Sequence, residues 1–198
     1  MSDLSPSDYP EYTAHMGGNL TKSTKLLGFG SRPALMVIGV FVNAARGAKA
    51  PILWIQTRFQ HPNMKDSRLL TKKMSGLDVL FASDESGLGD LLPGFEPDMQ
   101  AGDTTLYKKF HTASFGTNLS TQLHALNVDT LVICRACTGG SVRAMTLDAM
   151  QSGFRAMVVA KGCADMSRQV HFSNLFDLNA KYGDVVSMEA VENLKVEW

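Results

Sequence analysis

The chain has 198 residues, of which 44% are apolar and 19% are charged, a composition typical of one globular domain with a substantial core. Basic and acidic residues number 19 each, so no basic excess supports nucleic-acid binding, and no apolar run approaches the length of a membrane span. The N-terminal segment is polar and acidic, unlike a signal peptide. We therefore expect a cytoplasmic protein with neither nucleic acid nor a membrane as a partner.

Three cysteines, Cys134, Cys137 and Cys163, are an odd number for a disulfide framework and indicate reduced thiols in an intracellular protein. The first two have the CxxC spacing of a metal or redox pair. Only one further cysteine remains to complete a zinc site. We expect unlinked small residues near a turn.

The N-terminal half predicts an arm followed by two strands. Residues 1–31 show little periodicity, and we expect them to lie over the surface or over a neighbouring subunit, ahead of an α/β domain at 32–198. The apolar run at 34–41 predicts a buried parallel strand, and 51–59 predicts a second. Only about ten residues separate the two strands, close to the minimum for a complete crossover, so the helix expected at 42–50 has barely two turns.

The C-terminal half alternates strands and helices after a long polar segment at 61–103, which holds at most one short helix. Loops of that length often surround a site. The alternation is typical of a doubly wound parallel sheet with helices on both faces, in which ligands bind beyond the carboxyl ends of the strands. The expected strands are 104–110, 129–136, 155–165 and 184–188, and the expected helices are 117–128, 140–153 and 170–183.

The stretch "LVICRACTGGSVRAM" combines an apolar strand, a turn of small residues and the start of a helix. Ser141 lies in the first turn of that helix. The N-terminus of a helix favours negative charge, so α/β proteins use such a turn to hold an acyl group or an oxyanion. Ser141 is the candidate nucleophile of this position.

Several stretches together resemble the isochorismatase-like cysteine hydrolases, and most closely the N-carbamoylsarcosine amidase branch. The resemblance runs from about Gly28 to Ser187 and rests on "GFGSRPALMVI", "PILWIQTRF", "GDTTLYKKFHTASFGTNLSTQLHALNVDTLVIC", "GGSVRAMTLDAMQSGFRAMVV" and "HFSNLFDLNAKYGDVVS". It implies a six-stranded parallel sheet between helices, assembled into dimers or tetramers. Members of this family mostly cleave the C–N bonds of amides and carbamoyl groups, or a vinyl ether.

The resemblance also implies a catalytic set of aspartate, lysine and cysteine, carried over here in part. Lys108 occupies the lysine position, four residues before the serine of "KKFHTASFGT". The first strand of the family ends in "VID", and Gly39 stands at the position of its aspartate. The helix of the family begins "TSGCVRAT", and Ser141 stands at the position of its cysteine. Because a serine hydroxyl without a base is a poor nucleophile, the two substitutions predict loss of the hydrolytic machinery. A Ser–Lys pair would require Lys108 to be largely neutral.

Further candidates border the expected pocket. Arg58 can hold a carboxylate through two hydrogen bonds, although a salt bridge to a loop acid is the alternative. His111 can act as an acid or a base, or can donate a hydrogen bond to a ligand. The alternative is a loop histidine that faces water. We expect no cofactor, and no metal because the segment that supplies metal ligands in some relatives is missing after Gly39. The substrate-binding candidates are Arg58, His61, His111, Thr112, Phe115, Ala136, Cys137 and Thr138.

Three functions remain open, and the sequence leaves open whether the protein is an enzyme at all. The first is a repurposed enzyme that binds a small organic substrate in the family pocket and carries out a non-hydrolytic step such as isomerisation or cyclisation. The second is a residual amidohydrolase that uses Ser141 and Lys108. The third is a non-catalytic binding or assembly subunit, a homo-oligomer or a partner of an intact paralogue.

Overall fold

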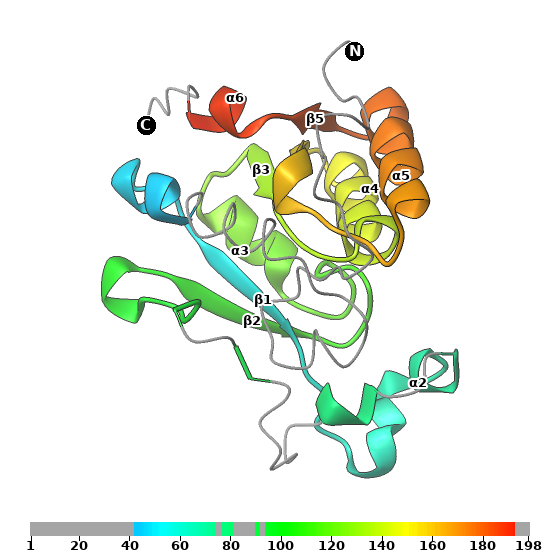
Figure 1. Ribbon diagram of the computed structural model, residues 1–198. Helices are drawn as coiled ribbons and strands as arrows, with labels where there is room; N and C mark the ends of the chain where they lie inside the picture. Colours follow the sequence, from blue (N-terminus) through cyan, green and yellow to red (C-terminus); the bar gives the residue numbers. More distant parts are fainter. Residues whose placement is uncertain (1–41, 74–76, 81–89, 92–93, 193–198) are drawn as a thin grey trace.

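The computed structural model describes residues 42–73, 77–80, 90–91 and 94–192 (Figure 1). The arm expected at 1–31 and the strand expected at 34–41, with Gly39, lie outside the described residues. The described strands pair in parallel within two sheets, one ordered β1-β2 and the other β3-β4-β5. An α/β architecture with parallel strands is therefore confirmed, while the sixth strand stays a prediction.

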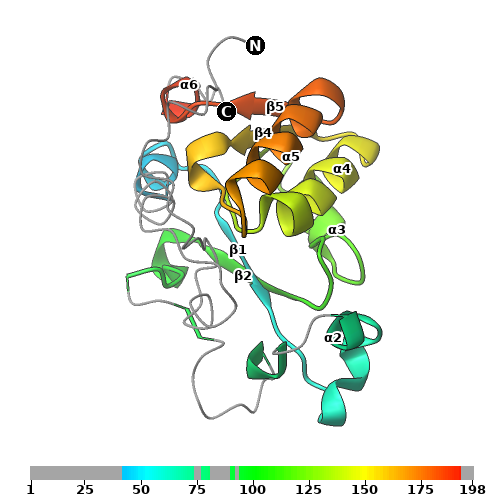
Figure 2. The ribbon, with the colours of Figure 1, turned by 45° about the vertical axis from the view of Figure 1, so that its right-hand side comes forward.

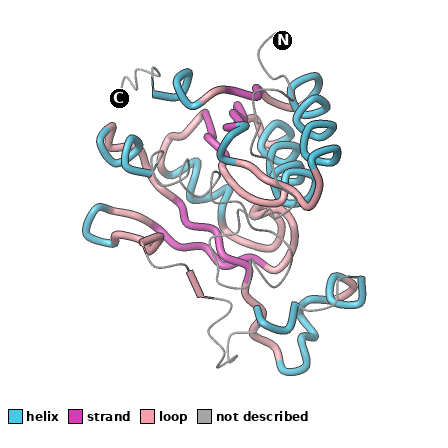
Figure 3. The backbone as a smooth tube through the Cα atoms, viewed as in Figure 1, coloured by secondary structure: helices cyan, strands magenta, loops and turns pink. Residues whose placement is uncertain are grey.

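The five described strands match the expected apolar runs but are shorter (Figure 3). Each run begins or ends in residues that leave the ladder and form turns, so sequence patterns overestimate strand length. The strands are β1 Leu53–Thr57, β2 Thr104–Lys108, β3 Thr130–Ile133, β4 Arg155–Val159 and β5 Asp184–Val186.

The helices include the short one expected in the first crossover, which occupies residues 42–47. The long polar segment holds more helical turns than expected. None of the helices in the described ranges is long and apolar enough to cross a membrane. The remaining helices are η3 Pro62–Ser67, α2 Leu70–Lys73, η4 Leu77–Leu80, η5 Met99–Ala101, α3 Leu119–Ala125, η6 Thr138–Val142, α4 Arg143–Gln151, η7 Ala160–Gly162, α5 Arg168–Lys181 and α6 Met188–Glu192.

Helices α3, α4 and α5 pack against the same side of the strands. Alternate residues of β4 point to one face, and of these Ala156 packs with Leu123 of α3 and Ala149 of α4, while Val158 packs with Leu175 of α5. Figures 1 and 2 show α4 and α5 side by side beside the three-stranded sheet. The start of α4 is thereby held near the carboxyl ends of the strands.

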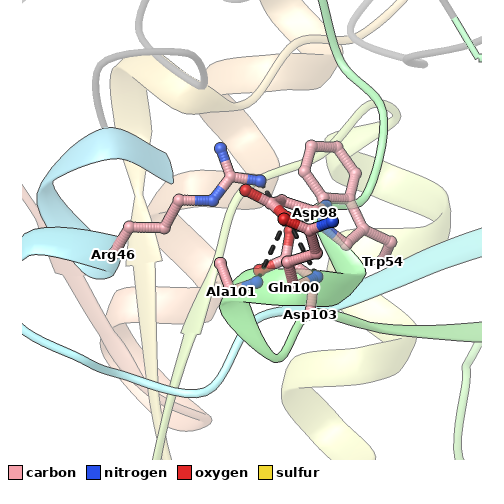
Figure 4. Close-up of polar contacts among 6 residues, drawn as sticks. All are labelled: Arg46, Trp54, Asp98, Gln100, Ala101 and Asp103. Atoms are coloured by element: carbon pink, nitrogen blue, oxygen red, sulfur yellow. Dashed lines mark hydrogen bonds and ion pairs between the residues drawn. The ribbon is translucent and has the colours of Figure 1, made fainter.

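A buried carboxylate ties the helix at 42–47 to the other sheet (Figure 4). Asp103 Oδ2 accepts hydrogen bonds from Arg46 Nη2 at 2.6 Å, from Trp54 Nε1 at 2.7 Å and from the Asp98 N–H at 2.9 Å. Burial raises the pKa of Asp103, but these donors outweigh it and hold the pKa below its ordinary value. This network lies at the amino ends of β1 and β2, opposite the candidate site.

Candidate active site

Lys108 is the last residue of β2 and faces the helices. Leu106, two residues earlier on the same face, belongs to the core beneath α3 and α4. Thr57, the register partner of Lys108, ends β1 on the same side. The carboxyl ends of β1 and β2 therefore open towards η6, the helical turn directly before α4 that contains Ser141.

The Lys108 amine is buried, with 2% of the residue exposed. Its Nζ donates to the carbonyl oxygens of Phe110, at 2.6 Å, and His111, and lies 3.3 Å from Ser141 Oγ. The two residues that the sequence assigned to the nucleophile and its lysine are thus in direct contact.

Burial, followed by the positive charge of Arg135, lowers the pKa of Lys108 to about 5, against a smaller opposing effect of Cys137. The amine is therefore neutral at pH 7. A neutral amine has two N–H donors and one lone pair. The two carbonyl oxygens take both donors, and the lone pair is left for the Ser141 hydroxyl, the arrangement that a general base requires.

The turn before Ser141 is held by a buried polar network from the ends of β4 and α5. Asp165 Oδ2 accepts the Gly139 N–H at 2.5 Å, and Thr138 Oγ1 lies 3.0 Å from the Ala164 oxygen and 2.8 Å from His171 Nδ1. Burial lowers the pKa of His171 to about 4, although Asp165 acts in the opposite direction. A neutral histidine and a carboxylate thus fix the turn in place.

The glycine pair in this turn is explained by close packing. A Cβ on Gly139 would lie 2.8 Å from Asn174 Nδ2, and one on Gly140 would lie 3.0 Å from Cys137 Sγ. A side chain at either position would require the neighbouring side chains or the turn to shift. The backbone N–H groups of Gly140 and Val142 both donate to the Cys137 oxygen at 3.2 Å.

Ala136 and Cys137 connect β3 to the turn through a cis peptide bond, and Ala136 pairs with Ala164. All three cysteines are free, as expected. Burial and then the Asp165 carboxylate raise the pKa of Cys137 to about 11, so its thiol is protonated near neutral pH and is a poor substitute nucleophile.

The sequence model of the isochorismatase domain family matches residues 20–190 of this chain. The chain belongs to the isochorismatase family. It is 31% identical over 195 residues to the maleamate amidohydrolase of Pseudomonas putida, covering 85% of this chain and 90% of that protein. It is 34% identical over 90 residues to the N-carbamoylsarcosine amidase of an Arthrobacter species, covering 46% of this chain and 34% of that protein.

The solved structures support the isochorismatase-like fold. A cysteine hydrolase from Pseudomonas syringae pv. phaseolicola superposes with a TM-score of 0.78 at 18% identity, with 89% of each chain covered. The family and α/β fold inferred from the sequence motifs are therefore confirmed. Within the described ranges no group of three or more His, Cys, Asp or Glu side chains could hold a metal ion.

His111 lies at the edge of this isochorismatase-family site. Its ring faces the turn, with Nδ1 3.6 Å from the position of a Cβ on Gly140, while the residue remains exposed. Burial, and then the positive charge of Arg135, lower the pKa of His111. The imidazole is therefore neutral and accessible at pH 7. Its ring faces the turn as well as the solvent.

The remaining candidates are Arg58, His61, Thr112 and Phe115. The Arg58 guanidinium is 5.9 Å from the centroid of the Tyr107 ring, on the face of β2 opposite Lys108. His61 is exposed and precedes η3. Thr112 Oγ1 accepts the Ser114 N–H at 3.1 Å. Phe115 is 61% exposed and packs edge-to-face on Phe110, with ring centroids 5.2 Å apart.

Arg135 is a site residue that the sequence analysis missed. It follows β3, and its guanidinium reaches across to the end of β1, donating to the Ile55 oxygen and to Thr57 Oγ1, each at 3.3 Å. Burial lowers the pKa of Arg135 to about 10, which leaves it charged at pH 7. The available signal was a single charged residue placed between an apolar strand and a turn of small residues.

Proposed function

We propose that this protein is an amidohydrolase of small amides in which Ser141 is the nucleophile and Lys108 is the general base. The observation that carries the proposal is the 3.3 Å contact between Lys108 Nζ and Ser141 Oγ at a buried amine whose pKa is lowered to about 5. In the sequence, the absence of a base for the serine argued against hydrolysis. A neutral lysine supplies one.

Each step of the reaction has a group to carry the proton. Ser141 Oγ attacks the amide carbonyl carbon while its proton passes to the Lys108 lone pair. Lys108 then donates that proton to the leaving nitrogen, and ammonia or an amine departs from the acyl-serine. Water attacks the ester, its proton passes to Lys108, and the proton returns to Ser141 Oγ as the acid leaves.

The turn offers a place for the oxyanion. The N–H groups of Thr138, Gly139, Gly140 and Val142 already have acceptors within the protein. We assign the Ser141 N–H, at the start of the helical segment, to the negative oxygen of the tetrahedral intermediate, because donors aimed at developing charge lower the barrier most.

The relatives support this class of reaction. The names of two relatives, maleamate amidohydrolase and N-carbamoylsarcosine amidase, describe hydrolysis of C–N bonds. The proposal differs from the family pattern only in the identity of the nucleophile and in the group that accepts its proton. An assembly with an intact paralogue, or a homo-oligomer, stays a prediction that light scattering and co-purification can test.

The test measures ammonia release from a panel of small primary amides and N-carbamoyl compounds, together with the mass of the protein after acid quench. We expect an acyl adduct on Ser141 in the wild type. Ser141→Ala removes the adduct and lowers kcat by about 10³-fold or more. Lys108→Met removes the base and lowers kcat similarly. Ser120→Ala, on the exposed side of α3, is the matched control and keeps full activity.

Two results contradict hydrolysis by Ser141. One is a Ser141→Ala variant with wild-type ammonia release. The other is a folded wild-type protein that neither releases ammonia nor forms an adduct with any member of the panel. The second result would favour the non-hydrolytic or binding functions, which the same compounds test through ligand-induced thermal stabilisation.

A further inference from the structure

The Arg135 guanidinium is built into the site rather than placed on the surface. Its Nε donates to the Ala136 oxygen at 3.1 Å, and its two terminal nitrogens donate to the Ile55 oxygen and to Thr57 Oγ1. These three contacts fix the side chain between the carboxyl ends of β3 and β1. An arginine held in this way is preorganised, so little conformational freedom is lost when a ligand binds.

Three contacts leave part of the donor capacity of Arg135 unused. A guanidinium has five N–H groups, and within the described ranges three of them donate, one from each nitrogen. One N–H therefore remains on each terminal nitrogen. Two N–H groups on a planar fork match the two oxygens of a carboxylate.

The positive charge of Arg135 is also uncompensated by the described part of the chain. All three of its acceptors are neutral oxygens, and no described carboxylate lies within salt-bridge distance of it. By contrast, Arg143 pairs with Asp177 at 2.6 Å and Arg155 pairs with Asp184 at 2.8 Å. A largely buried charge without a counter-ion favours an anionic ligand.

Arg135 lies close enough to the reacting groups for a small substrate to touch both. Its Nη2 contacts Thr57, and Thr57 is the register partner of Lys108, so the two strands place these positions about 5 Å apart. The charge of Arg135 acts directly on Lys108 and on His111. A carboxylate on Arg135 would thus lie a few bonds from a carbonyl carbon at Ser141 Oγ.

We infer that Arg135 binds a substrate carboxylate, and that the protein acts on short amides that carry a free carboxylate a few bonds from the scissile amide. This inference rests on the proposed function, since it names the substrate class of the same site. The bound carboxylate neutralises Arg135 and so makes Lys108 easier to protonate. Lys108 becomes a stronger base when the correct substrate is present.

The experiment compares succinamate with succinamide, a neutral isostere, as substrates, and succinate with succinamide as ligands in calorimetry. We expect wild-type kcat/KM to favour succinamate by about 10- to 100-fold, the effect of a hydrogen bond to a charged group. Arg135→Gln abolishes this preference, and Arg135→Lys keeps part of it. Arg155→Gln, which removes an exposed arginine from the opposite end of the sheet, keeps all of it.

A pH profile gives a second readout that a structural role would not change. For succinamate, the acid limb of kcat lies at a higher pH than the acid limb of kcat/KM, because kcat reports the substrate complex. For succinamide the two limbs coincide. Thermal unfolding of each variant shows that it is folded.

The two ideas fail in different ways. If wild-type protein binds succinate no more tightly than succinamide, or if folded Arg135→Gln binds succinate as tightly as wild type, the role of Arg135 is overturned. This holds whether or not either amide is hydrolysed. If succinate binds through Arg135 but Ser141→Ala leaves ammonia release unchanged, the nucleophile assignment is wrong and the carboxylate site stands.

Discussion

The Asp165 carboxylate accepts a hydrogen bond of 2.5 Å from the N–H of Gly139. Asp165 is 1% exposed and comes from the segment after β4, whereas Gly139 lies in the turn that leads into α4. The second oxygen of the carboxylate accepts the Met166 N–H at 2.8 Å. A buried anion from one strand end therefore fixes the peptide two residues before Ser141, so the position of the nucleophile depends on a contact outside the dyad.

Gly139→Ala should disable the site without removing any reactive group. The new Cβ would lie 2.8 Å from Asn174 Nδ2 and 3.2 Å from Asp165 Oδ2, so either these two side chains or the turn must shift, and a shift of Asp165 alters its contact with the Gly139 N–H. Since a displacement of about 1 Å can lower a rate by about 100-fold, we expect kcat for a reactive amide to fall by that order. Steady-state kinetics with circular dichroism as a folding check provides the measurement.

A double variant separates displacement from unfolding. Asn174→Ala removes the nearer clash, so Gly139→Ala with Asn174→Ala should recover part of the lost kcat. Wild-type kcat in the single Gly139→Ala variant would show that the turn tolerates the methyl group and that the Asp165 contact does not set the geometry.

The pH dependence of kcat/KM should report a neutral lysine. Because the pKa of Lys108 is lowered to about 5, the rate for an uncharged amide should be flat from about pH 6 to about pH 9 and fall roughly tenfold per pH unit below about 5. A lysine with an ordinary pKa would instead give a rate that rises throughout this range. His111→Gln should keep the acid limb, which distinguishes Lys108 from the nearby imidazole.

The strands and helices could be predicted because their apolar periodicity is local. Lys108 and Ser141 could also be named, since each sits at a strand or helix end within a recognisable motif. Their contact, and the pKa that follows from it, depend on burial by residues far away in the sequence. The same holds for Asp165 and Arg135, whose roles arise only when separate strand ends meet.

Stability should fall between about pH 6.5 and about pH 4 because of His171. Burial lowers its pKa from 6.5 to about 4, so the unfolded chain binds more protons in this window. The free energy of unfolding therefore rises with pH there, by at most about 1.4 kcal/mol per pH unit for one proton. Lys108, whose pKa is lowered to about 5, adds a slope of the same sign over most of this window. Urea titrations across the window should therefore show a steeper slope in wild type than in His171→Gln.

Thr138→Val is the matched control for this slope. It removes the hydroxyl that lies 2.8 Å from His171 Nδ1 but keeps the buried imidazole. We expect lower stability at every pH with the slope retained. An unchanged slope in His171→Gln would assign the pH dependence to other groups.

Asp103→Asn should destabilise the protein while leaving the chemistry intact. The substitution removes the anion that pairs with Arg46 at 2.6 Å, and the Asp103 side chain is only 2% exposed. Breaking a buried ion pair costs about 3 kcal/mol. The contribution of this carboxylate is complete above its ordinary pKa of 3.8 and disappears as the pH falls through its lowered folded value.

Asp184→Asn is the control for Asp103→Asn. It breaks an exposed pair and should cost less than about 1 kcal/mol. Because β2 separates Asp103 from Lys108 by about 16 Å, kcat measured well below the melting temperature should not change. A loss of kcat in folded Asp103→Asn would show that the helix at 42–47 supports the site as well as the sheet.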